Sequence, residues 1–291
     1  MISIPVASHD TAFKSQLDLF WSNHKTLYKS EATQKAHAIV VSQNYPNQAP
    51  IKFDEWGIDI PFSVVNGCWC YFDYEKYGRA LLPINIQIGL WQILELFDDE
   101  EVLELLDCDM FHLKKSPESK IKDDELVVCD AYENWHLKST TSNIDVLTPF
   151  LKNKHNKYNG GFVPIIGKAK TFKKIIYEWI DLHVKIYNNS SDESIRWWSG
   201  MYALQAACSN LNIKMTAANY CYIPGYNNLE EQHYIAHYCC DNFFDKRKLF
   251  YNKKKLDYKS FPENQFYESV TNWMRETKHL DGWKNHNACT I

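Results

Sequence analysis

Two carboxylates follow directly on an apolar stretch of the chain, in the order Asp107-Cys108-Asp109. The mostly apolar stretch Val102–Leu106 predicts a short strand, and residues two apart on extended backbone point to the same side. Carboxylate oxygens are the ligands that Mg²⁺ and Mn²⁺ prefer, and such an ion can neutralise a departing diphosphate. Ligands of open α/β sheets also gather at the carboxyl ends of strands. Position therefore favours a metal site, although an isolated pair of this kind is usually a solvated acidic turn.

A histidine stands at the end of a later predicted strand, Tyr234–His237. An imidazole can complete a Mn²⁺ site beside two carboxylates, although a lone histidine at a strand end is more often a partly buried residue with a protein partner. Lys246 and Arg247 follow nine and ten residues later. Either cation can meet a phosphate through charge-assisted hydrogen bonds, and the alternative is a solvated basic face.

Two further segments have residue types that suit a sugar or an anion. In Tyr158–Pro164, Gly160 and Gly161 would let the backbone approach a ligand closely, or would simply form a turn. Arg196–Tyr202 begins a predicted helix and contains Trp198. Tryptophan rings suit the apolar faces of sugars and helix amides suit anions, but such rings are as often anchors in the core.

The elements that must position these residues alternate between strands and helices. Apolar runs predict strands, and apolar residues at helical spacing predict helices. This alternation is typical of an α/β sheet. The predicted strands are 2–7, 38–42, 102–106, 125–129, 220–223 and 234–237, and the predicted helices are 12–28, 80–97, 168–187 and 194–211.

Composition narrows the class of protein. The 291 residues carry a net charge of −4, which argues against a dedicated nucleic-acid binder. With only 10 Gly and 10 Pro, and no shift of composition along the chain, we expect one domain over residues 1–291. The chain is rich in rings, with 10 Trp, 18 Tyr and 15 Phe, which supply core area or stacking faces.

The compartment is inferred from the start of the chain and from its cysteines. The first ten residues lack the basic region of a signal peptide, and no apolar run is long enough for a membrane span. The nine cysteines have no zinc-finger spacing, so reduced thiols are expected. We therefore expect a cytoplasmic protein without a membrane anchor.

The order of these motifs resembles that of the metal-dependent glycosyltransferases of the GT-A fold. More narrowly, it is similar to the hydroxyproline O-arabinosyltransferase and peptidyl-serine α-galactosyltransferase group. The likeness spans roughly residues 100–250. It rests on Leu105–Met110, on Trp197–Leu204 with its Trp-x-x-x-Met-Tyr-Ala pattern, and on Ile235–Tyr238 followed by Phe244–Arg247.

This resemblance implies a single GT-A-like α/β domain, with a mixed and mostly parallel central sheet flanked by helices. The nucleotide-binding half would cover about residues 1–110, and the acceptor half about residues 111–291. The metal ligands would be Asp107, Asp109 and His237, holding Mn²⁺ or Mg²⁺. The donor-binding residues would be Ser8, Arg79, Cys108, Gly160, Gly161 and Lys246.

One departure from the group concerns the catalytic carboxylate. The pattern usually has an acidic residue directly before Met-Tyr-Ala, and this chain has Gly200 there. Asp192 or Glu193 would have to substitute, and with Trp198 they form the predicted catalytic set. The resemblance favours retention of configuration at the transferred sugar.

The function expected from these residues is transfer of a sugar from a nucleotide diphosphate, most simply a UDP-sugar, to a hydroxyl of a protein or glycan. One alternative acceptor is a hydroxymethylated base in DNA, because residues 246–259 contain seven basic residues and one acid. An alternative of another class is a non-catalytic module that binds carbohydrate or nucleotide.

Overall fold

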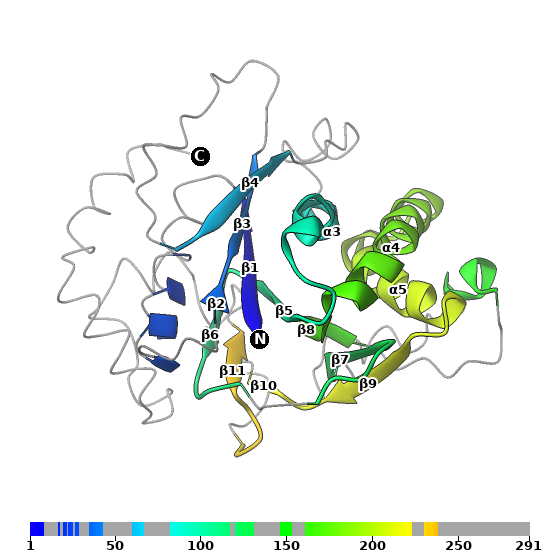
Figure 1. The fold of residues 1–291 in the computed structure, drawn as a ribbon. Coiled ribbons are helices and arrows are strands. Elements are labelled where there is room, and N and C mark those ends of the chain that lie inside the picture. Colours follow the sequence, from blue (N-terminus) through cyan, green and yellow to red (C-terminus); the bar gives the residue numbers. More distant parts are fainter. Residues whose placement is uncertain are drawn as a thin grey trace, which may run out of the picture.

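The computed structural model describes residues 1–8, 35–42, 60–66, 82–116, 120–130, 146–152, 161–222 and 230–237, and part of 17–28. At its centre is an eight-stranded sheet in the order β4-β3-β1-β5-β8-β7-β9, with β2 paired to β1 (Figure 1). Neighbouring strands are parallel except at β8, which is antiparallel to both β5 and β7. The strands are β1 (Ile2–Ser8), β2 (Lys35–Ala36), β3 (Ala38–Ser42), β4 (Phe62–Asn66), β5 (Val102–Asp107), β7 (Glu125–Asp130), β8 (Gly161–Lys168) and β9 (Lys214–Ala218).

The central strands are apolar along their length because both faces of the sheet are covered. In β3, Ala38, Ile39 and Val40 are fully buried, so side chains on both faces are shielded from water. The sequence of such a strand is a continuous run of apolar, often β-branched residues rather than an alternation of apolar and polar residues. Runs of this kind predicted strands over 2–7 and 38–42, and the structure confirms them as β1 and β3.

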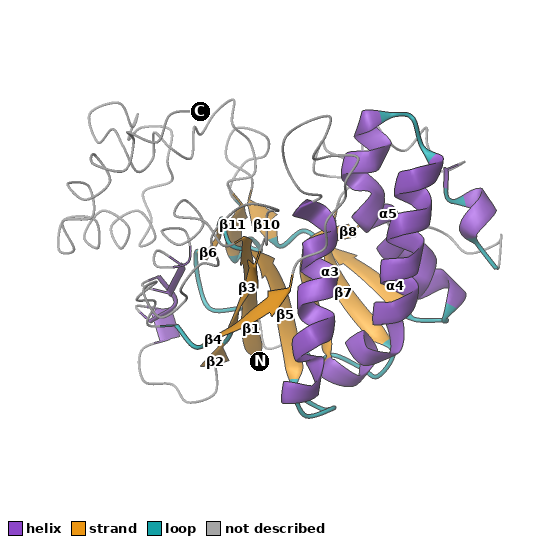
Figure 2. Cartoon of the chain, turned by 90° about the horizontal axis from the view of Figure 1, so that it is seen from above, coloured by secondary structure: helices purple, strands orange, loops and turns teal. Residues whose placement is uncertain are grey.

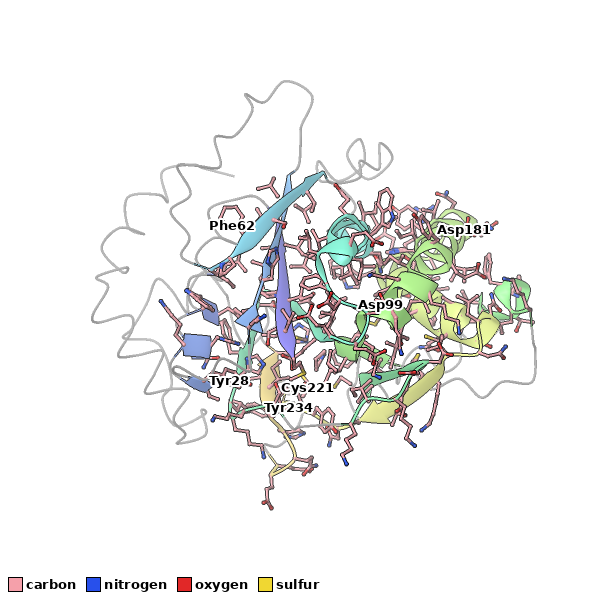
Figure 3. All side chains as sticks on the ribbon, in the orientation of Figure 1. Tyr28, Phe62, Asp99, Asp181, Cys221 and Tyr234 are labelled. Carbon is pink, nitrogen blue, oxygen red and sulfur yellow. The ribbon has the colours of Figure 1, made fainter. Side chains whose placement is uncertain are left out.

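Three helices lie together on one side of the sheet: α3 (Leu82–Ile93), α4 (Ala169–Asn189) and α5 (Glu193–Asn210) (Figures 1 and 2). In α4, buried residues recur at a spacing of three or four, as an amphipathic helix on a sheet requires. Side chains fill the space between these helices and the strands (Figure 3). The described residues of 17–28 are helical and lie on the other side of the sheet. Two 3₁₀ turns, η2 (Leu94–Leu96) and η4 (Thr148–Phe150), complete the helical elements of the described part.

A smaller sheet of three strands has the order β10-β11-β6. Its strands are β6 (Met110–His112), β10 (Cys221–Tyr222) and β11 (Ile235–His237). β6 follows β5 after only two residues, so the small sheet is attached directly to the centre of the large one. β11 pairs antiparallel with β6 and parallel with β10. A late segment of the chain thereby reaches the end of β5.

The expected α/β class and the mostly parallel sheet flanked by helices are confirmed. Strands β2, β4, β6, β8 and β9 are not among the strands predicted above. β6 has only three residues and β9 is half-exposed and starts with a lysine, so neither has the long apolar run that marks a central strand. Organisation of residues 1–291 as one domain with two functional halves remains a prediction. No helix in the described ranges combines the length and apolarity needed to cross a bilayer.

Candidate metal centre

The turn between β5 and β6 carries both carboxylates of the predicted motif. Asp107 is the last residue of β5, and Asp109 directly precedes β6. Between them Cys108 is 2 % exposed, so the turn is anchored in the core by its middle residue. In the pairing of β5 with β1, Asp107 stands opposite Val6 near the end of that strand. The two carboxylates therefore lie at the carboxyl edge of the parallel strands, where ligands of such sheets bind.

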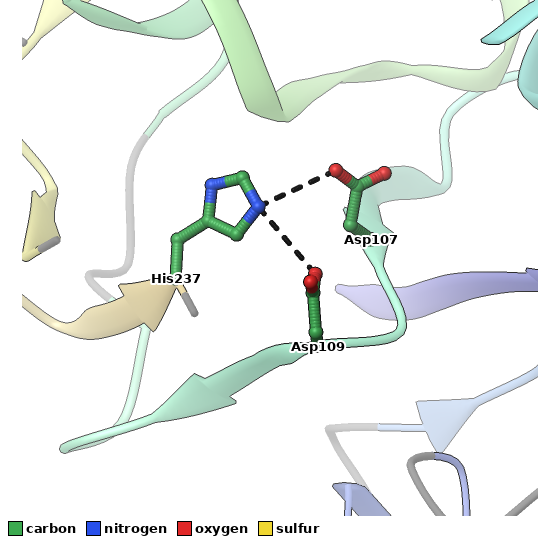
Figure 4. Close-up of side chains that lie close together, drawn as sticks. All are labelled: Asp107, Asp109 and His237. Atoms are coloured by element: carbon green, nitrogen blue, oxygen red, sulfur yellow. Dashed lines mark ion pairs between the residues drawn. The ribbon is translucent and has the colours of Figure 1, made fainter. Parts of the chain in front are cut away.

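β11 brings His237 to the same edge from a distant part of the chain. Its Cα pairs with that of Met110, the residue that follows Asp109. Nε2 of His237 lies 3.5 Å from Asp107 Oδ2 and 3.4 Å from Asp109 Oδ1 (Figure 4). One ligand atom from each residue lies within 4.8 Å of the others. The structure thus brings together all three residues that the sequence suggested as metal ligands.

This arrangement fits a divalent cation. Neighbouring ligands of an octahedral Mg²⁺ ion are about 3 Å apart, because each metal–oxygen bond is about 2.1 Å long. The separations from His237 to the two aspartates are only slightly longer. Two carboxylates and one imidazole also form the mixed oxygen and nitrogen set that suits Mn²⁺. The side chain of Asp107 is 32 % exposed, whereas those of Asp109 and His237 are nearly buried, so the site opens on the Asp107 side.

The two aspartates change the pKa of His237. Burial lowers the pKa of this imidazole, but the hydrogen bonds and charges of Asp107 and Asp109 outweigh burial and raise the pKa to about 9. The raised pKa reports a negative potential between the two carboxylates. A positive charge is therefore stabilised at this point, which is the electrostatic requirement of a cation site.

Beneath the turn, a fully buried glutamate connects the strands that carry the site. Oε2 of Glu104, in β5, accepts hydrogen bonds from Ser3 Oγ at 2.7 Å and from His112 Nε2 at 3.0 Å. Oε1 accepts from Ser116 Oγ at 3.0 Å and from the Tyr234 hydroxyl at 2.8 Å. Ser3 belongs to β1, His112 to β6, and Tyr234 directly precedes β11. One carboxylate therefore fixes β6 and the start of β11 against β1 and β5.

The same cluster holds the helical segment on this side of the sheet. Asn23 forms a pair of hydrogen bonds with the backbone N–H and C=O of His112, each 3.0 Å long. The backbone N–H of Ser116 donates to the Tyr28 hydroxyl at 2.8 Å. Tyr28 and Tyr234 are both labelled in Figure 3. Sequence reasoning missed Glu104 as a positioning residue; the available signal was a single acid inside an apolar strand.

The charge state of Glu104 follows from these contacts. Burial by itself raises the pKa of a carboxyl group, because it disfavours the charged form. The charge of His112 and hydrogen bonds from His112, Ser3 and Tyr234 outweigh burial and lower the pKa of Glu104 to about 2. Glu104 is therefore ionised at neutral pH.

β8 passes beside the candidate metal centre at its first residues. The ring of Phe162 lies 6.0 Å from that of His237, so the predicted glycine segment does reach the site. Gly161 has a packing reason to be glycine, since a Cβ there would meet Cγ2 of Val128 at 2.1 Å. Donor binding by Gly161 stays a prediction, and Gly160 lies outside the described residues.

The start of α5 places the predicted catalytic residues. Asp192 is the N-cap: its Oδ1 accepts from Ser194 N at 2.8 Å and from Ser194 Oγ at 2.6 Å, which lowers the pKa of Asp192. Glu193 is exposed in the first turn, and Trp198 packs partly buried against the core. These contacts give Asp192 a capping role and Trp198 a packing role; their catalytic roles stay predictions.

Gly200 lies where helices α3, α4 and α5 meet. A Cβ at this position would lie 3.0 Å from both Gln87 Nε2 and His183 Cε1, and the Gly200 carbonyl accepts from Trp179 Nε1 at 2.8 Å. An acidic side chain here would be buried between helices. Packing thus explains why this chain has glycine where the resembled group has an acid.

Comparison with known proteins gives structural neighbours only. No family model matches the sequence, and no curated protein does either. Two crystal structures of the galactosyltransferase LgtC do match in structure, one in complex with donor and acceptor sugar analogs and one of an active-site mutant with glutamate in place of glutamine. They have TM-scores of 0.51 and 0.52 at 10 % and 9 % sequence identity, and each alignment covers 94 % of this chain and 96 % of LgtC.

The chain has a GT-A fold. In this GT-A sheet the last residue of β1, Ser8, stands opposite Val41 at the carboxyl edge, two residues beyond the pairing of Val6 with Asp107. Its backbone lies at the edge where a donor-binding residue is expected, and donor binding by Ser8 stays a prediction. Arg79 and Lys246 lie outside the described residues, as do Tyr158 and Tyr238.

The pH dependence of folding tests the role of Glu104. Its folded pKa of about 2 lies below the ordinary value, so the ionised carboxylate stabilises the folded state at neutral pH. This stabilisation is lost as pH falls from about 4.5 towards 2, by at most about 3 kcal/mol. In urea unfolding, the free energy of unfolding should fall more steeply over this pH range in the native chain than in Glu104→Gln. Glu231→Gln, the same change at an exposed site, should keep the native profile, and parallel curves for native chain and Glu104→Gln would contradict the role.

Proposed function

We propose that this protein is a metal-dependent glycosyltransferase that moves a sugar from a nucleotide diphosphate donor to a hydroxyl group. The observation that carries the proposal is the convergence of Asp107, Asp109 and His237 at the carboxyl edge of a GT-A sheet. The fold alone supports many activities, so the donor set at this edge is the functional argument. LgtC, which was crystallised with donor and acceptor sugar analogs, has the same fold.

Different residues of the site are proposed to bind the metal ion and to stabilise the departing diphosphate. Asp107, Asp109 and His237 would hold Mn²⁺ or Mg²⁺, and the bound ion acts as a Lewis acid on the diphosphate. The exposed side of Asp107 leaves room for the donor phosphates next to the buried Asp109 and His237. Lys246 is proposed to add positive charge to the departing diphosphate, where negative charge develops.

The acceptor side has fewer assigned residues. In a retaining reaction the assigned carboxylate acts at the reacting sugar carbon rather than as a base on the acceptor. Hydrogen bonds from Ser194 occupy the Asp192 carboxylate and lower its pKa, and position 200 has no room for an acid. Glu193, which is exposed at the start of α5, is the better of the two proposed carboxylates. The proposed reaction is retaining, as the resemblance implies.

We also propose the chemical class of the sugar donor and of the acceptor. A UDP-sugar is the proposed donor, and a hydroxyl of a protein or glycan is the proposed acceptor, as in the arabinosyltransferase and galactosyltransferase group. Transfer to a hydroxymethylated base in DNA is the alternative, and the basic segment 246–259 on which it rests lies outside the described residues. Steep salt dependence of binding to duplex DNA would favour the alternative acceptor.

Donor hydrolysis tests the proposed activity. A screen of nucleotide sugars should find at least one that the native protein hydrolyses with Mn²⁺ and not in excess chelator. Asp109→Ala should lose at least about a hundredfold in rate, since it removes a ligand of the ion that neutralises the leaving group. Asp98→Ala, which removes an exposed carboxylate outside the site, should retain the native rate. Full activity of Asp109→Ala, or of the native protein in chelator, would contradict the proposal.

Thermal unfolding separates the enzyme from a simple binding module. A ligand that binds only the folded state raises the melting temperature. UDP should raise the Tm of the native protein only when Mn²⁺ is present, because an ion held by Asp107, Asp109 and His237 would supply the positive charge that the diphosphate needs beside two carboxylates. A rise with UDP in chelator, or with free sugar and no metal, would instead indicate a non-catalytic module.

A further inference from the structure

A pocket of about 470 Å³ opens at the amino edge of the sheet, away from the candidate metal centre. Ile2, at the start of β1, lines it, whereas Val6 of the same strand pairs with Asp107. Four residues of extended chain span about 13 Å. The pocket is thus separate from the proposed active site, and its volume is in the range of small-molecule sites.

Aromatic rings form much of the pocket wall. Trp21 is half-buried, and Tyr28 and Phe97 are nearly buried, so each presents part of a ring to the opening. Flat apolar faces of this kind pack against the C–H faces of sugar rings. The remaining apolar lining consists of Ile2, Ala36, Pro61 and Leu96.

Two lysines at the pocket, Lys25 and Lys35, have no carboxylate partner among the described residues. Lys25 Nζ lies 5.4 Å from the centre of the Trp21 ring, which does not neutralise its charge. Elsewhere in the described part, seven lysines are ion-paired: Lys152, Lys168, Lys170, Lys173, Lys174, Lys185 and Lys214. The carboxylate at the pocket, Glu101, accepts a hydrogen bond from Asp98 N rather than from either lysine.

Two imidazoles add neutral polar groups to the lining. Burial lowers the pKa of His24 to about 3 and also lowers that of His37, so both are uncharged at neutral pH. His37 shares a hydrogen bond with Ser63 Oγ at 2.8 Å. His24 is 2 % exposed, and its Nε2 has no hydrogen-bond partner within the ranges that the structure describes. A polar group bound in the pocket would lower the free-energy cost of burying that nitrogen.

We propose that this pocket binds an acidic saccharide, meaning a sugar ring that carries a carboxylate or phosphate group. The apolar face of the ring packs on Trp21, its hydroxyls meet polar groups of the wall, and its anionic group lies between Lys25 and Lys35. The positive charge of the two lysines exceeds that of the single Glu101 carboxylate, which favours an anion over a neutral sugar. The proposal goes beyond the proposed glycosyl transfer and does not depend on it.

Saturation-transfer NMR tests the proposal with glucose 6-phosphate and glucuronate as probes, and with glucose and inorganic phosphate as matched partial ligands. Both acidic sugars should bind, and each partial ligand should bind at least about tenfold more weakly, because it lacks the ring or the charge. Lys25→Glu/Lys35→Glu should weaken binding of the acidic sugars by at least about tenfold. These lysines are at the surface, so the variant should keep the native Tm.

The controls separate this pocket from other sites. Lys120→Glu/Lys122→Glu reverses the charge at two exposed positions outside the pocket and should leave binding of the acidic sugars unchanged. Asp109→Ala should also bind the acidic sugars normally, so failure of the proposed enzyme activity would leave this result unaffected. Absence of binding, unchanged binding in Lys25→Glu/Lys35→Glu, or phosphate or glucose binding as tightly as glucose 6-phosphate would each overturn the proposal.

Discussion

One buried carboxylate determines the geometry on which the rest of this structure depends. An ionised group inside a protein is costly unless its oxygens are fully hydrogen-bonded. Glu104 meets this condition only when Ser3, His112, Ser116 and Tyr234 all converge on it. These donors come from β1, from β6 and the residues after it, and from the entry to β11. The strands that carry the candidate metal ligands are therefore held in one relative position by the buried Glu104 network beneath the site.

Close packing fixes the surroundings of the site in a comparable way. Gly161 lets β8 approach Val128 of β7, and this places Phe162 beside His237. Gly200 lets α5 approach α3 and α4. At both positions an added Cβ would push apart elements that are now in close contact. The two edges of the sheet then differ in chemistry: acids at the carboxyl edge favour a cation, and lysines at the amino edge that have no carboxylate partner in the described part of the chain favour an anion.

The sequence predicts those features that depend on local pattern. Apolar runs located β1, β3, β5 and β7, and the placement of Asp107 and Asp109 after a strand located the candidate metal centre. The end of the predicted strand 234–237 singled out His237 as a possible third ligand, and the family resemblance assigned it to the site. Its pairing beside the aspartates could not be predicted, because β6 and β11 have three residues each and form by pairing across the chain. The sequence signal of the glutamate network was limited to one acid inside an apolar strand, since its donors come together only in the folded sheet. The amino-edge pocket is likewise formed by residues that are far apart in the sequence. The capping role of Asp192 was not predicted, although an aspartate just before a predicted helix is a capping signal.

The proposed function requires that Asp107, Asp109 and His237 bind one divalent cation in positions set by β5, β6 and β11. Titration with Mn²⁺, with the free ion followed by electron paramagnetic resonance, measures this binding. We expect one tightly bound ion per chain, and at least about tenfold weaker binding in each of Asp107→Asn, Asp109→Asn and His237→Ala. Native binding in all three variants, or no bound ion in the native protein, would contradict it.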